Sequence, residues 1–202
     1  MQLRKEEKYT YNDYCQWDDG NRYELIDGEV YLMAPAPGIG HQRISGGLSN
    51  QLYNYLRGKR CEVFTAPFDV RLNADTADDT VVQPDISVIC DPNKIKNGKS
   101  CVGAPDMIME ILSPSTAKRD NFVKFKRYLA AGVREYWIVN PETKTVHVYV
   151  LKEDEYVSRV YGETDSVPVG VLEDCLINLA DVFPQETEVP QEGGGHGPGS
   201  GK

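Results

Sequence analysis

Two apolar runs, each with an acidic residue inside it, limit the folds open to this chain of 202 residues. The first run is V-V-Q-P-D-I-S-V-I, residues 81–89, and carries Asp85; the second is D-M-I-M-E-I-L-S, residues 106–113, and carries Glu110. Both runs are too apolar for edge strands, so they predict buried strands of a central sheet. A charged side chain in such a strand should be paired or bound to a metal ion.

Side-chain alternation along each strand decides whether the two acids could share a site. If the strands are neighbours, Asp85 and Glu110 can converge on one face of the sheet. Taken singly, each acid could be a solvated residue at a strand end; taken as a pair, they favour a functional site. The expected shared faces are Asp85, Ser87 and Ile89 in the first strand, and Asp106, Ile108, Glu110 and Leu112 in the second.

The residue types suggest chemistry on phosphate. Mg²⁺ prefers oxygen ligands and keeps several waters, so one or two carboxylates with substrate phosphate oxygens suffice to bind it. A nearby ammonium group can orient water or neutralise developing charge. Lys124, in the helical segment that follows the second run, is the candidate ammonium.

Four ordered segments resemble the Uma-two family of nucleases, which have a restriction-endonuclease-like fold, and the resemblance extends to about Phe183. It implies an α/β domain with a central mixed sheet flanked by helices, an N-terminal hairpin and C-terminal strands. The segments are Y-E-L-I-D-G-E-V-Y-L-M-A-P (23–35), Q-P-D-I-S-V-I (83–89), G-A-P-D-M-I-M-E-I-L-S-P-S-T (103–116) and G-V-R-E-Y-W-I-V-N-P-E (132–142).

The resemblance implies a PD-(D/E)XK site in which Asp85 and Glu110 are the two acids. The lysine of that pattern, expected two residues after the second acid, is replaced by Leu112, and the matching family position is Lys124. The implied activity is Mg²⁺- or Mn²⁺-dependent endonuclease cleavage of DNA. Fold analogy suggests a homodimer for cutting both strands.

Helical periodicity gives two interpretations of Lys124. At about 100° per residue, Phe122, Phe125 and Leu129 form an apolar stripe, and Lys124 lies on the opposite side. A solvated basic surface and a catalytic lysine fit this pattern equally, and the family resemblance favours the second. The residues expected opposite the stripe are Asp120, Lys124, Arg127 and Tyr128.

Glu24 and His41 complete the candidate site. Glu24, in a strand before the Asp27-Gly28 turn, matches a family glutamate and could bind the metal, or could form a cross-strand salt bridge. His41 opens a helical segment and is a candidate substrate contact, although a surface or capping role fits as well. Further substrate contacts are expected from a basic segment that includes Lys118, Arg119 and Arg127.

The charge balance opposes broad nucleic-acid binding, because 31 acidic against 22 basic residues give a net charge of −9. Six basic residues and one acid between Lys118 and Arg134 are a local exception. We therefore expect narrow engagement of DNA. The alternative function is a catalytically inactive binding or regulatory module, which Leu112 and the acidic surface favour.

Composition predicts one domain, residues 1–184, followed by a flexible Gly-rich tail, residues 185–202. No apolar run approaches the length of a membrane helix, so we expect a soluble cytoplasmic protein without membrane contact. Five scattered cysteines predict reduced thiols rather than a disulfide framework or a zinc site.

The expected elements form one central sheet with helices. Helices are predicted near residues 11–17, after His41 and over 122–131, the last ending at Gly132 as a C-cap. Strands are predicted in the 23–33 hairpin and near 63–72, 82–90, 107–112, 135–139, 146–151 and 156–161, before a final apolar segment over 167–183.

Overall fold

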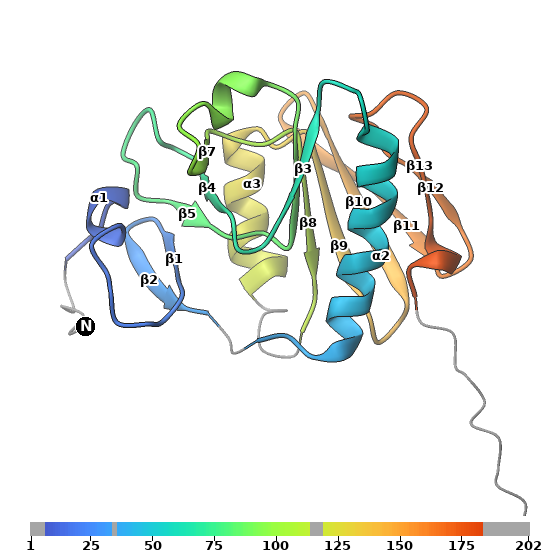
Figure 1. Cartoon of the computed structure of the whole chain (residues 1–202), viewed down its shortest axis with the longest axis horizontal. Coiled ribbons are helices and arrows are strands. Elements are labelled where there is room, and N and C mark those ends of the chain that lie inside the picture. The colour runs from blue at the N-terminus through green and yellow to red at the C-terminus, as the bar shows by residue number, and fades with distance from the viewer. Residues whose placement is uncertain (1–6, 34–35, 114–118, 184–202) are drawn as a thin grey trace, which may run out of the picture.

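A computed structural model describes residues 7–33, 36–113 and 119–183, without the side chains of residues 119–121. It is a mixed α/β fold with few helices (Figure 1). The largest sheet has six strands, and it is mixed because β8 and β9 run parallel while the other pairs are antiparallel. In spatial order its strands are β11 (Glu155–Gly162), β10 (Thr145–Lys152), β9 (Glu135–Asn140), β8 (Met107–Ile111), β6 (Ile86–Ile89) and β3 (Glu62–Thr65).

The expected central mixed sheet is confirmed, and beside it the described residues form two further sheets, which contain the N-terminal hairpin and the C-terminal strands. Two of the expected strands each break into two short strands that join different sheets. Pro67 and Pro84 lie at these breaks and lack the backbone N–H that a continuous ladder would need. The second sheet has the order β2 (Glu29–Leu32), β1 (Tyr23–Ile26), β5 (Val81–Val82), β4 (Asp69–Arg71) and β7 (Ser100–Val102); the third pairs β12 (Ser166–Pro168) with β13 (Leu176–Asn178).

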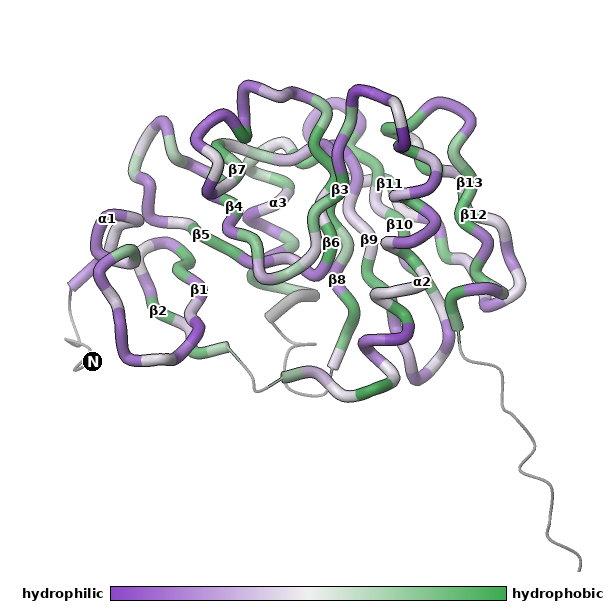
Figure 2. The backbone as a smooth tube through the Cα atoms, in the orientation of Figure 1, coloured by the Kyte–Doolittle hydropathy of each residue, from purple (hydrophilic) through white to green (hydrophobic). Residues whose placement is uncertain are grey.

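Helices α2 (Ile39–Leu56) and α3 (Phe125–Ala131) flank the six-stranded sheet on opposite sides (Figure 1). The α2 helix buries Ile44, Leu48, Leu52 and Leu56, which recur every four residues and therefore line one face. The strands between the helices are hydrophobic and many connecting loops are hydrophilic (Figure 2). The smaller elements are α1 (Tyr11–Tyr14), the 3₁₀ turns η1 (Pro92–Ile95) and η3 (Leu179–Asp181), and a π-helical turn η2 (Arg119–Lys124).

Strand alternation divides the core as the sequence predicts. Ile86 and Met109, a cross-strand pair, belong to the apolar cluster that contains the α2 side chains. Ile89 and Ile108 belong to the other cluster, with Tyr128 of α3. Each buried strand therefore presents apolar side chains to both layers, which explains why its sequence is apolar almost throughout.

Two local predictions are confirmed by backbone conformation. Asp27 and Gly28 have φ values of 53° and 76°, the left-handed pair that a tight two-residue hairpin turn between β1 and β2 requires. Gly132 follows α3 with φ of 80°, and its N–H donates to the Leu129 carbonyl, so it is the expected C-cap. No helix among the described residues is long and apolar enough to cross a membrane.

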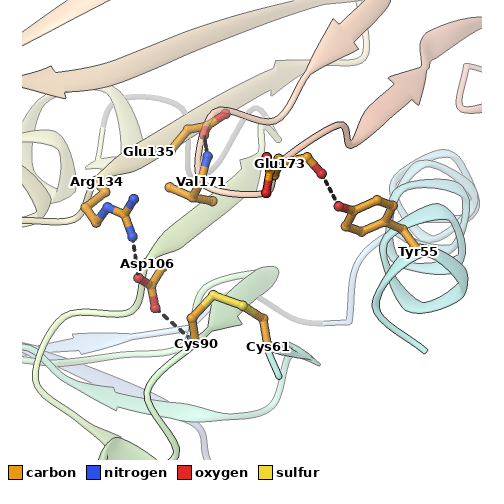
Figure 3. The surroundings of a disulfide bond; sticks show 8 residues. All are labelled: Tyr55, Cys61, Cys90, Asp106, Arg134, Glu135, Val171 and Glu173. Atoms are coloured by element: carbon orange, nitrogen blue, oxygen red, sulfur yellow. Dashed lines mark hydrogen bonds and ion pairs between the residues drawn. A yellow bond between two sulfur atoms is a disulfide. The ribbon is translucent and has the colours of Figure 1, made fainter. Parts of the chain in front are cut away.

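The expectation that all cysteines are reduced is wrong for Cys61 and Cys90, which form a disulfide (Figure 3). They lie just outside β3 and β6, whose pairing sets Glu62 opposite Ile89, so the same register places the two cysteines opposite each other. Their separation of 29 residues hides this pairing in the sequence. Cys101 is buried as predicted, and burial raises the pKa of its thiol to about 12.

We predict that replacing both Cys61 and Cys90 with serine lowers the free energy of unfolding by about 3–4 kcal/mol, because the disulfide closes a loop of 29 residues in the unfolded chain. Urea denaturation of the oxidised protein and the double variant measures the change. Cys15→Ser is the control, because the Cys15 thiol is exposed. Cys101 and Cys175 are unsuitable because their thiols are buried. Equal midpoints for the oxidised protein and the Cys61/Cys90 variant would contradict the prediction.

Candidate active site

Three elements bring Glu24, Glu110 and Lys124 into one buried cluster. Glu24 comes from β1 in the second sheet, Glu110 from β8 in the six-stranded sheet, and Lys124 from the end of η2. The Lys124 Nζ lies 2.8 Å from Oε1 of Glu24 and 2.8 Å from Oε1 of Glu110. The three residues are 0, 3 and 2% exposed, so these charges interact with little screening by solvent.

Two further donors hold the carboxylates of this cluster. The Tyr128 hydroxyl donates to Oε1 of Glu110 at 2.6 Å, and the backbone N–H of Gln83 donates to Oε1 of Glu24 at 3.0 Å. Desolvation, with the nearby charge of Glu110, raises the pKa of Tyr128 well above its ordinary value. Tyr128 therefore keeps its proton and acts as a donor to Glu110.

The predicted orientation of the Lys124 helix is wrong. Lys124 and Tyr128 face the interior, whereas Phe122, which was placed in the apolar core stripe, is 65% exposed. The π-helical turn η2 accounts only for Phe122, because its wider turn breaks the α-helical spacing before Phe125. Lys124 and Tyr128 share a face of the helix by their i, i+4 spacing, and both contact Glu110 on the sheet. The two carboxylates then offset the cost of burying the ammonium.

Asp85 lies beside this cluster, at the start of β6. The register of β6 and β8 pairs Ile86 with Met109, and its continuation places Asp85 opposite Glu110. Oδ2 of Asp85 accepts the backbone N–H of Ile111, the residue after Glu110, at 2.7 Å. His41, in the first turn of α2, places Nε2 3.2 Å from the same oxygen. The site thus combines two groups, Glu24–Lys124–Glu110 and Asp85–His41, which meet where β6 neighbours β8.

The residues fit a hard divalent cation by donor type, because Asp85 and Glu110 supply carboxylate oxygens at neighbouring positions. With both glutamates ionised, the ammonium of Lys124 leaves the cluster of three with a net negative charge. Among the described residues, however, no group of three or more His, Cys, Asp or Glu side chains is arranged to hold a metal ion. The assignment of Glu24, Asp85 and Glu110 as metal ligands stays a prediction.

The remaining sequence candidates lie elsewhere. Leu112 packs partly buried against the α3 side of the core. Arg127 forms an ion pair with Asp27, so its guanidinium contacts the hairpin turn between β1 and β2. Lys118 lies outside the described residues, as does the side chain of Arg119. Their predicted contacts with substrate remain predictions.

Sequence reasoning missed the parts played by Tyr128 and Gln83. Tyr128 stands four residues after Lys124, a spacing that places two side chains on one helical face, and this signal could have found it. Gln83 acts through its backbone N–H, which no side-chain pattern reveals.

Comparisons with known proteins identify the family and the fold. Residues 11–180 match the Uma2 family, described as "Putative restriction endonuclease". An uncharacterized protein of Synechocystis, slr1290, is 30% identical over 150 residues, covering 73% of this chain and 76% of that protein. The crystal structure of a "putative nuclease belonging to DUF820" from Anabaena variabilis has the same fold, with a TM-score of 0.69 and 21% identity over 87% of this chain and 97% of that one. The restriction-endonuclease-like fold expected from the sequence is confirmed, and the chain belongs to the Uma2 family.

Proposed function

We propose that this protein is a metal-dependent endonuclease that hydrolyses phosphodiester bonds in DNA. The observation that carries the proposal is the 2.8 Å contact between Lys124 Nζ and Glu110 Oε1, on the strand that neighbours Asp85. A PD-(D/E)XK nuclease needs two acids and an ammonium in one place. Lys124 supplies from a helix the charge that Leu112 cannot supply from the strand.

Each residue of the site has a different role in the proposed hydrolysis. Asp85 and Glu110 would hold Mg²⁺ or Mn²⁺, which when bound polarises the phosphate and lowers the pKa of a coordinated water. Hydrolysis joins the oxygen of water to phosphorus and breaks the P–O bond to the departing sugar oxygen, which takes up a proton. Lys124 stabilises the negative charge that grows on the phosphate oxygens. Tyr128 fixes the Glu110 carboxylate, and His41 fixes that of Asp85.

Two carboxylates favour the charged form of Lys124, so its part in the reaction is that of a cation rather than of a proton acceptor. The net charge of −9 opposes a general grip on DNA. Lys126, exposed on α3 two residues after Lys124, is the described basic residue of the 118–134 segment best placed to contact phosphate near the site. We therefore propose that the protein contacts few DNA phosphates and that its affinity for DNA falls as the salt concentration rises.

The test is cleavage of supercoiled plasmid by the purified protein. We expect nicking with Mg²⁺ or Mn²⁺, its loss on adding a chelator, and a reduction of roughly 10²–10³-fold in Asp85→Asn. Asp154→Asn, at an exposed turn, is the matched control and should cleave at the normal rate. Cleavage that persists in chelator, or at full rate in Asp85→Asn, would refute the proposal.

The second candidate is a catalytically inactive module that binds nucleic acid or regulates a partner. The observation that favours it is the double pairing of Lys124, which already neutralises charge at both glutamates without a metal. Plasmid that stays intact with either metal, while a gel-shift assay still shows binding, would favour this candidate over the enzyme.

A further inference from the structure

We infer that Glu24 is a positioning residue that acts through Lys124 and is not a ligand of the metal. The inference rests on the proposed nuclease function, and it assigns Glu24 a role different from the one that the family resemblance implies. Three observations lead to it: the atoms that Glu24 contacts, the place of β1 in the fold, and the position of the ammonium between the two glutamates.

Two contacts of Glu24 are with a cation and with backbone. Its Oε1 receives both the Lys124 ammonium at 2.8 Å and the Gln83 N–H at 3.0 Å. Because Glu24 is fully buried, this oxygen holds two donors in the interior, where water does not compete for them. This oxygen therefore fixes the positions of the Lys124 ammonium and the Gln83 N–H.

The place of β1 explains what is fixed. Glu24 reaches from the second sheet to Lys124 at the start of α3 and to Gln83, two residues before Asp85. One carboxylate therefore positions the two segments that deliver the amine and the first acid. Such a residue affects the reaction without touching the substrate.

The ammonium also separates Glu24 from the proposed metal ligands. Lys124 lies within 2.8 Å of Glu24 and of Glu110, and a cation between two carboxylates repels a second cation from the space they share. Asp85, in contrast, bonds His41 and the backbone beside Glu110. The metal position consistent with these contacts is on the Asp85 side of Glu110, away from Glu24.

A double-mutant cycle on cleavage tests the inference. Glu24→Gln keeps an acceptor for Gln83 but loses the charge, and we expect kcat to fall about 10²-fold with little change in KM. If Glu24 acts through Lys124, adding Glu24→Gln to Lys124→Ala should slow cleavage no further. Losses that multiply in the double variant would overturn the inference. Glu29→Gln, exposed on the neighbouring strand, is the control.

Binding of Mn²⁺, measured by titration calorimetry, separates a positioning residue from a ligand. We expect the dissociation constant of Glu24→Gln to stay within about threefold of the parent value, and that of Asp85→Asn to rise by at least about tenfold. A rise in Glu24→Gln as large as in Asp85→Asn would show that Glu24 is a ligand. Glu24→Asp, which retains the charge, should restore part of kcat, and equal rates for the Asp and Gln variants would count against an electrostatic role.

A stability cycle distinguishes failure of this inference from failure of the proposed function. Urea midpoints of Glu24→Gln, Lys124→Ala and the double variant require no cleavage or metal. We expect the double variant to be more stable than Lys124→Ala alone, because one uncompensated buried carboxylate is removed. If the stability losses of the two single variants simply add in the double variant, the coupling of Glu24 to Lys124 is refuted even in an active enzyme. If the losses are coupled but the protein cuts no DNA, the pairing stands and the proposed nuclease function is refuted.

Discussion

Lys124→Ala is expected to slow cleavage by roughly 10³-fold and to lower the free energy of unfolding by about 4 kcal/mol, since removing one partner of a buried ion pair leaves uncompensated charge. The variant leaves Glu24 and Glu110 buried without the ammonium that joins them. Urea denaturation measures the stability change, and plasmid nicking at saturating metal measures the activity. The effect should exceed that of most single substitutions.

Lys126→Ala is the matched control, because Lys126 belongs to the same helix but is exposed. Its unfolding free energy should stay within about 0.5 kcal/mol of the parent value. Equal, modest and salt-sensitive losses of cleavage in both variants would show that the two lysines only attract phosphate. Unchanged stability of Lys124→Ala would contradict the buried ion-pair network.

Glu135→Ala is expected to lower the free energy of unfolding by about 3–4 kcal/mol at the opposite end of the sheet. Oε2 of Glu135 accepts the Val171 N–H at 2.9 Å (Figure 3). Oε1 accepts the buried Trp137 indole N–H at 2.6 Å, so truncation leaves both donors without their acceptor. Burial raises the pKa of this fully buried carboxyl, although the hydrogen bonds oppose the shift. Thermal unfolding followed by tryptophan fluorescence reports the loss.

Glu142→Ala, at an exposed turn after the same strand, should leave the melting temperature nearly unchanged. Gly170→Ala offers an independent check, since a Cβ there would lie 3.1 Å from Oε2 of Glu135 and disturb the same carboxylate. A melting temperature of Glu135→Ala equal to that of Glu142→Ala would mean that water replaces the carboxylate at no cost.

The sequence was sufficient to predict the strand pair that carries the acids. Asp85 and Glu110 occupy apolar runs whose alternation the structure follows, and the hairpin turn at Asp27 and Gly28 needs only local rules. These features depend only on residues close together in the sequence. The division into separate sheets was beyond such rules, because it depends on which partner each short strand finds on either side of Pro67 and Pro84.

The candidate residues Glu24, Glu110 and Lys124 lie together in the structure, whereas the orientation of the Lys124 helix was not predicted. Periodicity predicts a core stripe of Phe122, Phe125 and Leu129, whereas the helix buries Lys124 and Tyr128, which both contact Glu110 on the sheet. The Cys61–Cys90 disulfide follows from the register of β3 and β6, which sequence spacing does not contain. In both cases the missing information is tertiary: the contact of a helix with the sheet, or the alignment of two strands.

The origin of Lys124 in a helix has a consequence for how such sites can diverge. An acid and a lysine two residues apart on one strand are tied together, so an insertion between them destroys the site. Here Glu110 and Lys124 are 14 residues apart, and a connection between a strand and a helix can change in length while both ends stay in place. Proteins built this way can acquire new loops at the edge of the catalytic centre, and hence new preferences for nucleic-acid shape, without losing the pair. Searches that require a fixed acid-to-lysine spacing will pass over them.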